Sequence, residues 1–426
     1  VLHYAKLCAL AGGVDAFLIG SELRGLTSLR GTGNSFPFVS ALVALAADVK
    51  AMLPGTKVSY AADWSEYFGY HPTDGTGDVF FNLDPLWSSP QVDFIGIDNY
   101  MPLTDWRDGH QHTDRLAGVT SIYDPEYLAS GIAGGEGYDW YYASEAARQS
   151  QTRSAITDGA YGKPWIFRYK DLKSWWLNPH YDRPGGVEAV AATGWVPQSK
   201  PFWFTEAGSP AIDKGTNQPN AFVDAKSAES LVPYFSSGER DDLTQNRYVT
   251  ALNTYWSAAG AHNPVSSLYG SAMVDAGRIL FWAWDARPFP FFPARADLWS
   301  DAVNYARGHW LNGRIGAVPL ARLIEAVCAQ YGFADLDVSE VEGLVDGYLI
   351  DRPMSARDAL EGVLAAFAID AVERNGLIAF HMRQSDPVLS VGVDGFVETD
   401  AAQPLFALTR AQETELPAVV RLAYVE

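Results

Sequence analysis

The chain has 426 residues, of which 48% are hydrophobic, and a formal net charge of -20 at pH 7. This length predicts two or three domains with substantial cores. An acidic chain without clustered Lys and Arg is not expected to bind nucleic acid or an anionic membrane surface, and no apolar stretch is expected to span a membrane. Cys8 and Cys328 lie far apart in helix-like segments, so free thiols are expected rather than a disulfide framework.

Strand-like apolar runs alternate with helical patterns over the first part of the chain. A helical pattern over residues 38–52 ends at Pro54-Gly55. The predicted strands cover residues 16–20, 57–61, 92–99, 200–205 and 279–285. Alternation of this kind is typical of an α/β fold with a parallel sheet and crossover helices. Residues 102–201 are too many for an ordinary connection, so we predict an elaborated loop at a functional face.

A change of composition near residue 310 predicts a domain boundary. The fourteen tryptophans occur up to Trp310, and none follows. The predicted elements beyond that point are two amphipathic helices and a hairpin, over residues 319–331, 355–367 and 368–381. The hairpin is expected to turn at Asn375-Gly376, a dipeptide typical of two-residue loops. We therefore predict a first domain over residues 1–312 and an α+β domain over residues 316–426.

Polar and aromatic residues follow each predicted strand of the first domain. Two apolar runs end in glutamates, Glu22 and Glu206, as strands of a parallel sheet do when their carboxyl ends open into a site. The five strand ends deliver Ser21-Glu22, Asp63-Trp64, Asp98-Asn99-Tyr100, Thr205-Glu206 and Trp284-Asp285. Convergence of such ends is the geometry of a TIM-barrel active face. A single glutamate just past a strand usually faces solvent, but the repeated pattern favours paired carboxylate chemistry.

Five segments resemble strands four to eight of retaining TIM-barrel glycoside hydrolases. They are residues 20–22, 61–64, 93–100, 200–206 and 281–284. In those enzymes the acid/base follows strand four and the nucleophile follows strand seven, so the resemblance implies Glu22 as acid/base and Glu206 as nucleophile. Ser21 stands where those enzymes usually have Asn. The resemblance also implies that strands one to three lie upstream of Val1, which leaves the sheet an unpaired edge on each side.

Residues around the two glutamates are expected to bind the substrate. The predicted substrate-binding residues are Ser21, Asp63, Trp64, Asp98, Asn99, Tyr100, Trp282, Trp284 and Asp285. Tyr100 could hydrogen-bond the nucleophile or help to raise the pKa of the acid. Tryptophans in this set, together with Trp140 and the pair Trp175-Trp176, could offer flat apolar faces to pyranose rings. Packing in a core or an interface is the alternative for each of them.

Longer strings are similar to the large tail-hub protein of gene transfer agents and related phages. Residues 3–27, 63–70, 134–142 and 282–288 resemble its TIM-barrel-like domain, and residues 351–360 and 408–417 resemble the phage-tail domain that follows. The resemblance implies action on a host cell-wall or surface polysaccharide during DNA delivery. It also implies tail or baseplate partners, a homotrimer, and a place in the virion tail after assembly in the bacterial cytoplasm. The alternative is a non-catalytic carbohydrate-binding or structural module on the same fold.

No cofactor or metal is predicted for this function. One loop combines His110 and His112 with Asp105, Asp108 and Asp114, residue types that could ligate a metal. A polar loop of this composition is more often simply solvated. We therefore keep the metal site only as a weaker alternative.

Overall fold

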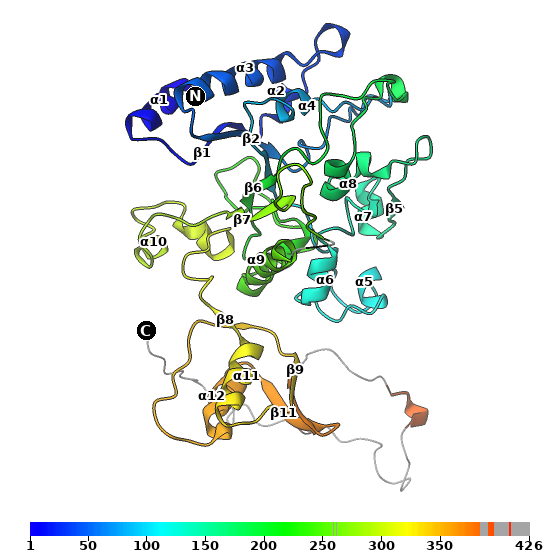
Figure 1. Ribbon diagram of the computed structural model, residues 1–426. Coiled ribbons are helices and arrows are strands. Elements are labelled where there is room, and N and C mark those ends of the chain that lie inside the picture. The colour runs from blue at the N-terminus through cyan, green and yellow to red at the C-terminus, as the bar shows by residue number, and fades with distance from the viewer. Residues whose placement is uncertain (259, 261, 384–390, 396–408, 410–426) are drawn as a thin grey trace. The chain divides into compact units, whose positions relative to one another are not determined.

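The computed structural model describes residues 1–258, 260, 262–383, 391–395 and 409 (Figure 1). Five parallel strands form one sheet in the order β1-β2-β3-β6-β7. These strands are β1 (Ala16–Ser21), β2 (Lys57–Asp63), β3 (Ile95–Asn99), β6 (Phe202–Ala207) and β7 (Val274–Phe281). The predicted α/β fold with a parallel sheet is confirmed. The sheet is open, because within the described residues β1 and β7 each pair with a single neighbour.

Two details of the strand prediction are wrong. Strand β7 ends at Phe281, so Trp284 and Asp285 lie in the turn beyond it rather than at the end of a strand. The strand begins at Val274, five residues earlier than expected. The apolar pattern did not reveal this start, because residues 274–278 include polar side chains that an edge strand can expose. Strand β1 is also an edge strand, and its Leu18 is 38% exposed although the apolar run of residues 17–19 predicts a strand of a parallel sheet, which is usually buried on both faces.

Helices precede or connect the strands of the sheet along the chain. The longer ones are α1 (Leu2–Leu10), α3 (Pro37–Met52) and α9 (Asp242–Ser257), and the short ones are α2 (Arg24–Thr27), η1 (Thr32–Asn34), α4 (Asp84–Trp87) and η4 (Gly215–Asn217). Helix α3 begins with a proline in its first turn and buries Val39, Leu42, Ala46 and Val49, which share one helical face. It packs on β1 and β2 and lies beside α1, as Figure 1 shows, while α9 contacts β7.

By length and composition, the helical stretch Thr32–Met52 could cross a membrane. The expectation that no apolar stretch reaches this length is therefore wrong. However, extended backbone at Ser35 separates the short η1 turn from α3, whose 16 residues span about 24 Å, less than the hydrocarbon core of a bilayer. Part of the apolar composition of α3 is accounted for by Val39, Leu42, Ala46 and Val49, which are buried.

The close approach of β2 and β3 depends on a glycine. A Cβ atom at Gly96 would lie 2.5 Å from the carbonyl oxygen of Tyr60, so a side chain there would push the two strands apart. Aromatic residues fill the adjoining core, in which Trp87, Trp175 and Trp176 are fully buried. The core that adjoins the sheet is therefore rich in fully buried aromatic side chains.

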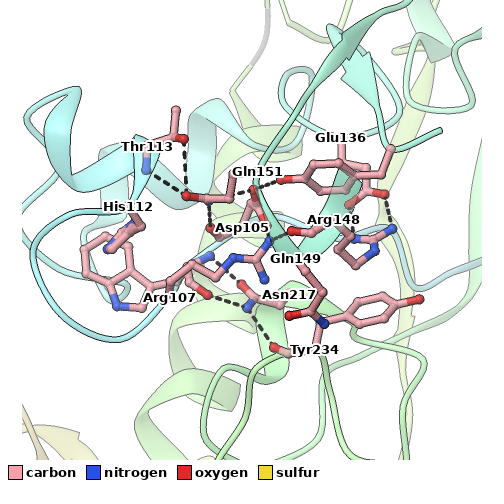
Figure 2. Close-up of polar contacts among 12 residues, drawn as sticks. Asp105, Arg107, His112, Thr113, Glu136, Arg148, Gln149, Gln151, Asn217 and Tyr234 are labelled. Atoms are coloured by element: carbon pink, nitrogen blue, oxygen red, sulfur yellow. Dashed lines mark hydrogen bonds and ion pairs between the residues drawn. The ribbon is translucent and has the colours of Figure 1, made fainter. Parts of the chain in front are cut away.

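The predicted loop over residues 102–201 is an insertion made of short elements. They are α5 (Thr113–Leu116), α6 (Pro125–Ser130), β4 (Trp140–Tyr141), α7 (Glu145–Gln149), β5 (Ser154–Ala155), η2 (Pro164–Phe167), α8 (Leu172–Leu177) and η3 (Pro184–Gly186). Arginines organise part of it (Figure 2). Arg148 makes a bidentate ion pair with Glu136 at 2.6 and 2.9 Å, and the Arg107 guanidinium stacks on the Phe235 ring at 3.1 Å. Ion pairs and ring contacts of this kind hold loop segments in place where there is no regular backbone hydrogen bonding of a helix or sheet.

The remaining elements follow residue 290. They are α10 (Phe291–Ala294), η5 (Ala302–Arg307), β8 (Val318–Pro319), α11 (Leu320–Gln330), β9 (Leu336–Glu340), β10 (Leu344–Val345), α12 (Ala356–Ala366), β11 (Ile369–Arg374), β12 (Leu377–Met382) and η6 (Val393–Gly395). Strands β11 and β12 form the expected hairpin, in which Asn375 and Gly376 have φ values of 56° and 81°. Two positive φ values in a two-residue loop match the turn that this dipeptide favours.

The chain divides into two compact units. The first comprises residues 1–334 and 342–359, and the second comprises residues 335–341 and those described from 360 onward. This division differs from the predicted boundary near residue 316. The pairing of β8 with β10 keeps the chain around α11 in the first unit, a non-local contact that composition does not reveal. In the second unit the strand order is β11-β12-β9.

Candidate functional site

A cleft of about 1290 Å³ opens at the carboxyl ends of the parallel strands. Each of the five strands contributes a residue at or just beyond its end, namely Glu22, Asp63, Tyr100, Glu206 and Phe281. Parallel strands bring their carboxyl ends to one edge of the sheet, which is where ligands bind in such folds. The cleft is therefore the candidate active site.

The cleft includes some of the predicted site residues and excludes others. Those lining it are Glu22, Asp63, Tyr100, Glu206, Trp282, Trp284 and Asp285. Ser21, Trp64, Asp98 and Asn99 do not line it. Asp98 and Asn99 are buried, and Trp64 packs against the Tyr169 ring at a centroid distance of 4.7 Å. Contact of these four residues with a ligand, expected from their place at the strand ends, therefore stays a prediction.

Asp98 instead connects the strands that carry the two glutamates. Its Oδ2 accepts a hydrogen bond of 2.9 Å from Ser21 Oγ, and its Oδ1 accepts one of 2.7 Å from Thr205 Oγ1. Ser21 immediately precedes Glu22, and Thr205 immediately precedes Glu206. Burial, together with the charge of Glu206, raises the pKa of Asp98 to about 6. This carboxyl group fixes the relative position of the two strand ends.

The backbone at Glu22 is held in an unusual conformation. Its φ is 52°, in the left-handed region that non-glycine residues seldom adopt. Glu22 N donates to Ala61 O at 2.8 Å, and the next amide, Leu23 N, donates to Tyr60 Oη at 2.6 Å. The Tyr60 hydroxyl in turn donates to the buried Glu66 at 3.1 Å. Left-handed residues that are held by their surroundings occur frequently at functional sites.

The carboxyl group of Glu22 has a strongly perturbed pKa. Partial desolvation raises it to about 7, and the negative charges of Asp98, Asp63 and Glu206 act in the same direction. Glu22 is therefore close to half protonated at neutral pH. A carboxyl group in this state can donate a proton and later accept one.

The second glutamate has a dedicated donor. Tyr100 Oη donates a hydrogen bond of 2.8 Å to Glu206 Oε2. Burial, followed by the charge of Glu206, raises the pKa of Tyr100 above its usual value, so its hydroxyl remains protonated. The hydrogen bond fixes the orientation of the Glu206 carboxylate in the cleft.

One part of the cleft wall follows β7. Trp282 is 51% exposed and Trp284 is 67% exposed, so both present open aromatic faces. Asp285 pairs with Arg287 and accepts a hydrogen bond of 3.0 Å from Trp310 Nε1. The hydrogen bonds from Arg287 lower the pKa of Asp285 to about 2. Asp285 therefore remains ionised and anchors the turn.

Sequence reasoning missed two other parts of the wall. Residues Asn220, Phe222, Val223, Asp224, Glu229 and Leu231 line one part, and residues Asp301, Asn304, Gly308, His309 and Trp310 line the other. The first group comes from irregular backbone with no strand or motif to mark it. Only the tryptophan at position 310 could have been noticed as a candidate. The folding of distant loops over the sheet, rather than any local pattern, brings these residues to the cleft.

Other expected sugar platforms have structural roles. Trp175 and Trp176 are fully buried in the core. Trp140 packs beneath the Arg153 guanidinium, which lies 4.2 Å from its ring centroid. None of the three lines the cleft.

The loop considered for metal binding uses its carboxylates in ion pairs. Asp105 pairs with Arg107 and Arg153 at 2.8 Å each, and Arg153 also pairs with Asp114 at 2.8 Å. Asp108 pairs with Lys214 at 2.7 Å. Among the residues that the structure describes, no group of three or more His, Cys, Asp or Glu side chains is arranged to hold a metal ion. The two cysteines are free thiols, as expected.

Comparison with known proteins identifies the family. A family model described as "GTA TIM-barrel-like domain" matches residues 1–293, and one described as "Putative phage tail protein" matches residues 355–426. No curated protein matches. A chain in the solved structure "Virion of native gene transfer agent (GTA) particle" is 32% identical, with a TM-score of 0.22, over 26% of this chain and only 27% of that chain. Because the first match covers more than half of its residues, the chain belongs to the gene transfer agent TIM-barrel-like family, as a tail protein whose barrel-like part precedes a phage-tail domain.

Proposed function

We propose that the open barrel of this tail protein is a retaining glycoside hydrolase that cuts a host cell-wall or surface polysaccharide during DNA delivery. The observation that carries the proposal is the pair of strand-end glutamates in one cleft, one of which has a pKa of about 7. In this enzyme class two carboxyl groups about 5 to 5.5 Å apart divide the work of acid and nucleophile.

The proposed reaction has two steps. In the first, Glu22 donates its proton to the glycosidic oxygen while the Glu206 carboxylate attacks the anomeric carbon, so that a covalent glycosyl ester forms and the leaving sugar departs as an alcohol. In the second, Glu22 removes a proton from water, which attacks the anomeric carbon and releases Glu206. Tyr100 orients Glu206 in both steps through its hydrogen bond.

The site supports separate roles for the two glutamates. Glu22 is surrounded by carboxylates that oppose its ionisation, whereas Glu206 receives a hydrogen bond from a hydroxyl group. A general acid near neutral pH and an oriented carboxylate are the states that the first step requires. We further propose that the protein assembles in the bacterial cytoplasm as a trimer with other tail or baseplate proteins.

A binding module is the second candidate function. The exposed faces of Trp282 and Trp284 in a large open cleft would serve to hold a glycan even without chemistry. In that case the tail would use the cleft for attachment, and the two glutamates would contact sugar hydroxyls.

Mutants of the two glutamates distinguish these functions. In the full protein, Glu22→Ala is expected to retain turnover of aryl glycosides with good leaving groups, which depart without protonation, and azide is expected to rescue it. Glu206→Ala is expected to lose activity on all substrates, because every substrate needs the nucleophile. The control is Glu361→Ala, at an exposed position outside the cleft. Equal and unrescued loss in both mutants would contradict the separate roles. A wild type that binds glycans but cuts none would establish the binding module.

A further inference from the structure

The walls of the cleft carry a strong excess of negative charge. The acidic side chains that line it are Glu22, Asp63, Glu206, Asp224, Glu229, Asp285 and Asp301. Arg287 is the one Lys or Arg side chain among its lining residues, all of which lie within the described part of the chain. Carboxylates that converge on a cleft with low-dielectric walls focus their field into it.

Arg287 is not available to an anionic ligand. Its Nε donates to Asp285 at 2.9 and 3.0 Å, and its Nη1 and Nη2 donate to Asp301 at 2.8 and 2.9 Å. Nη2 also donates to Asp285 at 2.5 Å, and the guanidinium stacks on the Phe292 ring at 3.6 Å. The N–H donors of the Arg287 guanidinium are already bonded to two carboxylates. Arg287 therefore offers a ligand neither a net positive charge nor a free bidentate binding site.

The histidine in the wall supplies no positive charge either. His309 is buried, and burial lowers its pKa to about 4. Its Nε2 lies 2.7 Å from the carbonyl oxygen of Pro219, a partner for a neutral ring that donates through this nitrogen. At neutral pH the ring is therefore uncharged.

The aromatic part of the wall favours the same kind of ligand. The exposed faces of Trp282 and Trp284 can pack against the apolar face of a sugar ring. The negative face of an indole also attracts cations, such as the ammonium group of an amino sugar. Neither contact recruits an anion.

We infer that the cleft takes glycans without anionic groups, either uncharged or amine-bearing, and excludes those that carry uronate, sialate, sulfate or phosphate. The inference rests on the proposed function, since it names the substrate class of the same site. An anionic sugar would have to leave water beside several carboxylates, and the described residues that line the cleft include no unpaired Lys or Arg to compensate. Repulsion between charges closer than the Debye length, about 8 Å at physiological ionic strength, is only partly screened.

A set of glycans that share one backbone tests the inference. Chitosan hexamers are prepared with free amines, with N-acetyl groups and with N-succinyl groups, so that charge changes while the linkage is constant. Binding to the full protein carrying Glu206→Gln is measured by calorimetry at pH 6. The amine and acetyl forms are expected to bind at least tenfold more tightly than the succinyl form, with a difference that narrows as salt is added. Equal or tighter binding of the succinyl form would overturn the inference.

A pair of variants links the effect to the cleft. Asp301→Asn removes a wall charge and partly releases Arg287, so the penalty on the succinyl form is expected to fall several-fold. Asp297→Asn is the matched control, because Asp297 pairs with Arg295 at 2.6 Å in the same segment but does not line the cleft. An equal effect of both variants would show that net charge, and not this cleft, controls binding.

A measurement without any glycan distinguishes a failure of the inference from a failure of the proposed function. The fluorescence contributed by Trp284 is obtained as the difference between the wild type and Trp284→Phe. Relative to neutral acrylamide, caesium is expected to quench this component more efficiently than iodide does, because the local potential is negative. A preference for iodide would overturn the inference. A preference for caesium without binding of any hexamer would support the exclusion of anions from the cleft and count against the proposed action on a polysaccharide with this backbone.

Discussion

Asp98 has a central position in the site although it does not line the cleft. It accepts hydrogen bonds from the residues that precede both glutamates, and its negative charge is the largest cause, after burial, of the raised pKa of Glu22. Side chains from alternate strands meet in layers inside a barrel, which explains how β3 reaches Ser21 on β1 past β2. The residue therefore connects the geometry of the site to its electrostatics.

Asp98→Asn is expected to lower the pKa of Glu22 below about 7. The amide can still bond both hydroxyls, but it no longer opposes ionisation of Glu22. The general acid must be protonated, so activity falls as pH rises through the pKa of Glu22, and this limb of the profile should move to lower pH. NMR titration of the Glu22 carboxyl checks the shift without any substrate. Asp93→Asn is the control, since Asp93 pairs with Lys50 just before β3. An unchanged titration in Asp98→Asn would contradict the electrostatic role.

Tyr100→Phe is expected to reduce both stability and activity. Loss of the hydrogen bond to Glu206 should cost about 1–2 kcal/mol of unfolding free energy and leave the nucleophile poorly oriented. Tyr123→Phe is the matched control, because its hydroxyl makes a bond of the same 2.8 Å length to Asp241, outside the cleft. Denaturant unfolding and kcat should show similar destabilisation in both variants and an activity loss only in Tyr100→Phe. Full activity in Tyr100→Phe would remove this residue from the mechanism.

At the scale of elements, the β11–β12 hairpin is the clearest local prediction. Gly376 has a φ of 81° with open space around it, so Gly376→Ala tests backbone conformation alone. The variant is expected to lose about 1 kcal/mol of unfolding free energy. Gly392→Ala, at a position without positive φ and with equally open surroundings, should change stability little. Equal unfolding midpoints for the two variants would argue against the turn seen here.

Local signals explain which elements could be predicted. Strands β2, β3 and β6 are largely buried, and each carries at or next to its last position a polar residue that the sequence singled out. Strand β7 was misplaced because an edge strand can expose Arg278 and Leu280, which hides its pattern. The role of Asp98 also escaped prediction. A carboxylate at a strand end has the same sequence signature whether it faces a ligand or two buried hydroxyls.

Local sequence patterns also predict only part of the cleft lining. Glu22 and Glu206 were found because each ends an apolar run. Asp224 and Glu229 come from irregular backbone and reach the cleft only through long-range folding. Their negative charge contributes to the cleft only once the distant segments have folded together, so no single segment of the sequence predicts it.

At the scale of the whole molecule, the open sheet leaves apolar side chains uncovered. Tyr4, Leu7 and Leu10 on α1 are exposed, as is Leu18 on the edge strand β1. Apolar surface of this kind favours association. The isolated chain is therefore expected to bind an apolar dye and to self-associate in sedimentation velocity experiments. Tyr4→Lys with Leu10→Lys should reduce both effects, whereas Leu298→Lys, at another exposed leucine, should not. A monomeric wild type over a wide concentration range would contradict this expectation.

Covalent trapping of the nucleophile is the direct test of whether Glu206 forms a glycosyl-enzyme intermediate. The full protein is incubated with a panel of cyclophellitol-type epoxides and 2-deoxy-2-fluoro glycosides, which esterify the nucleophile of retaining glycosidases, and the digested protein is analysed by mass spectrometry. A single glycosyl adduct is expected on the peptide that contains Glu206, absent from Glu206→Gln and formed more slowly by Glu22→Ala with reagents that need protonation. An adduct on a different residue, or none across the panel in protein that binds glycans, would contradict this role of Glu206.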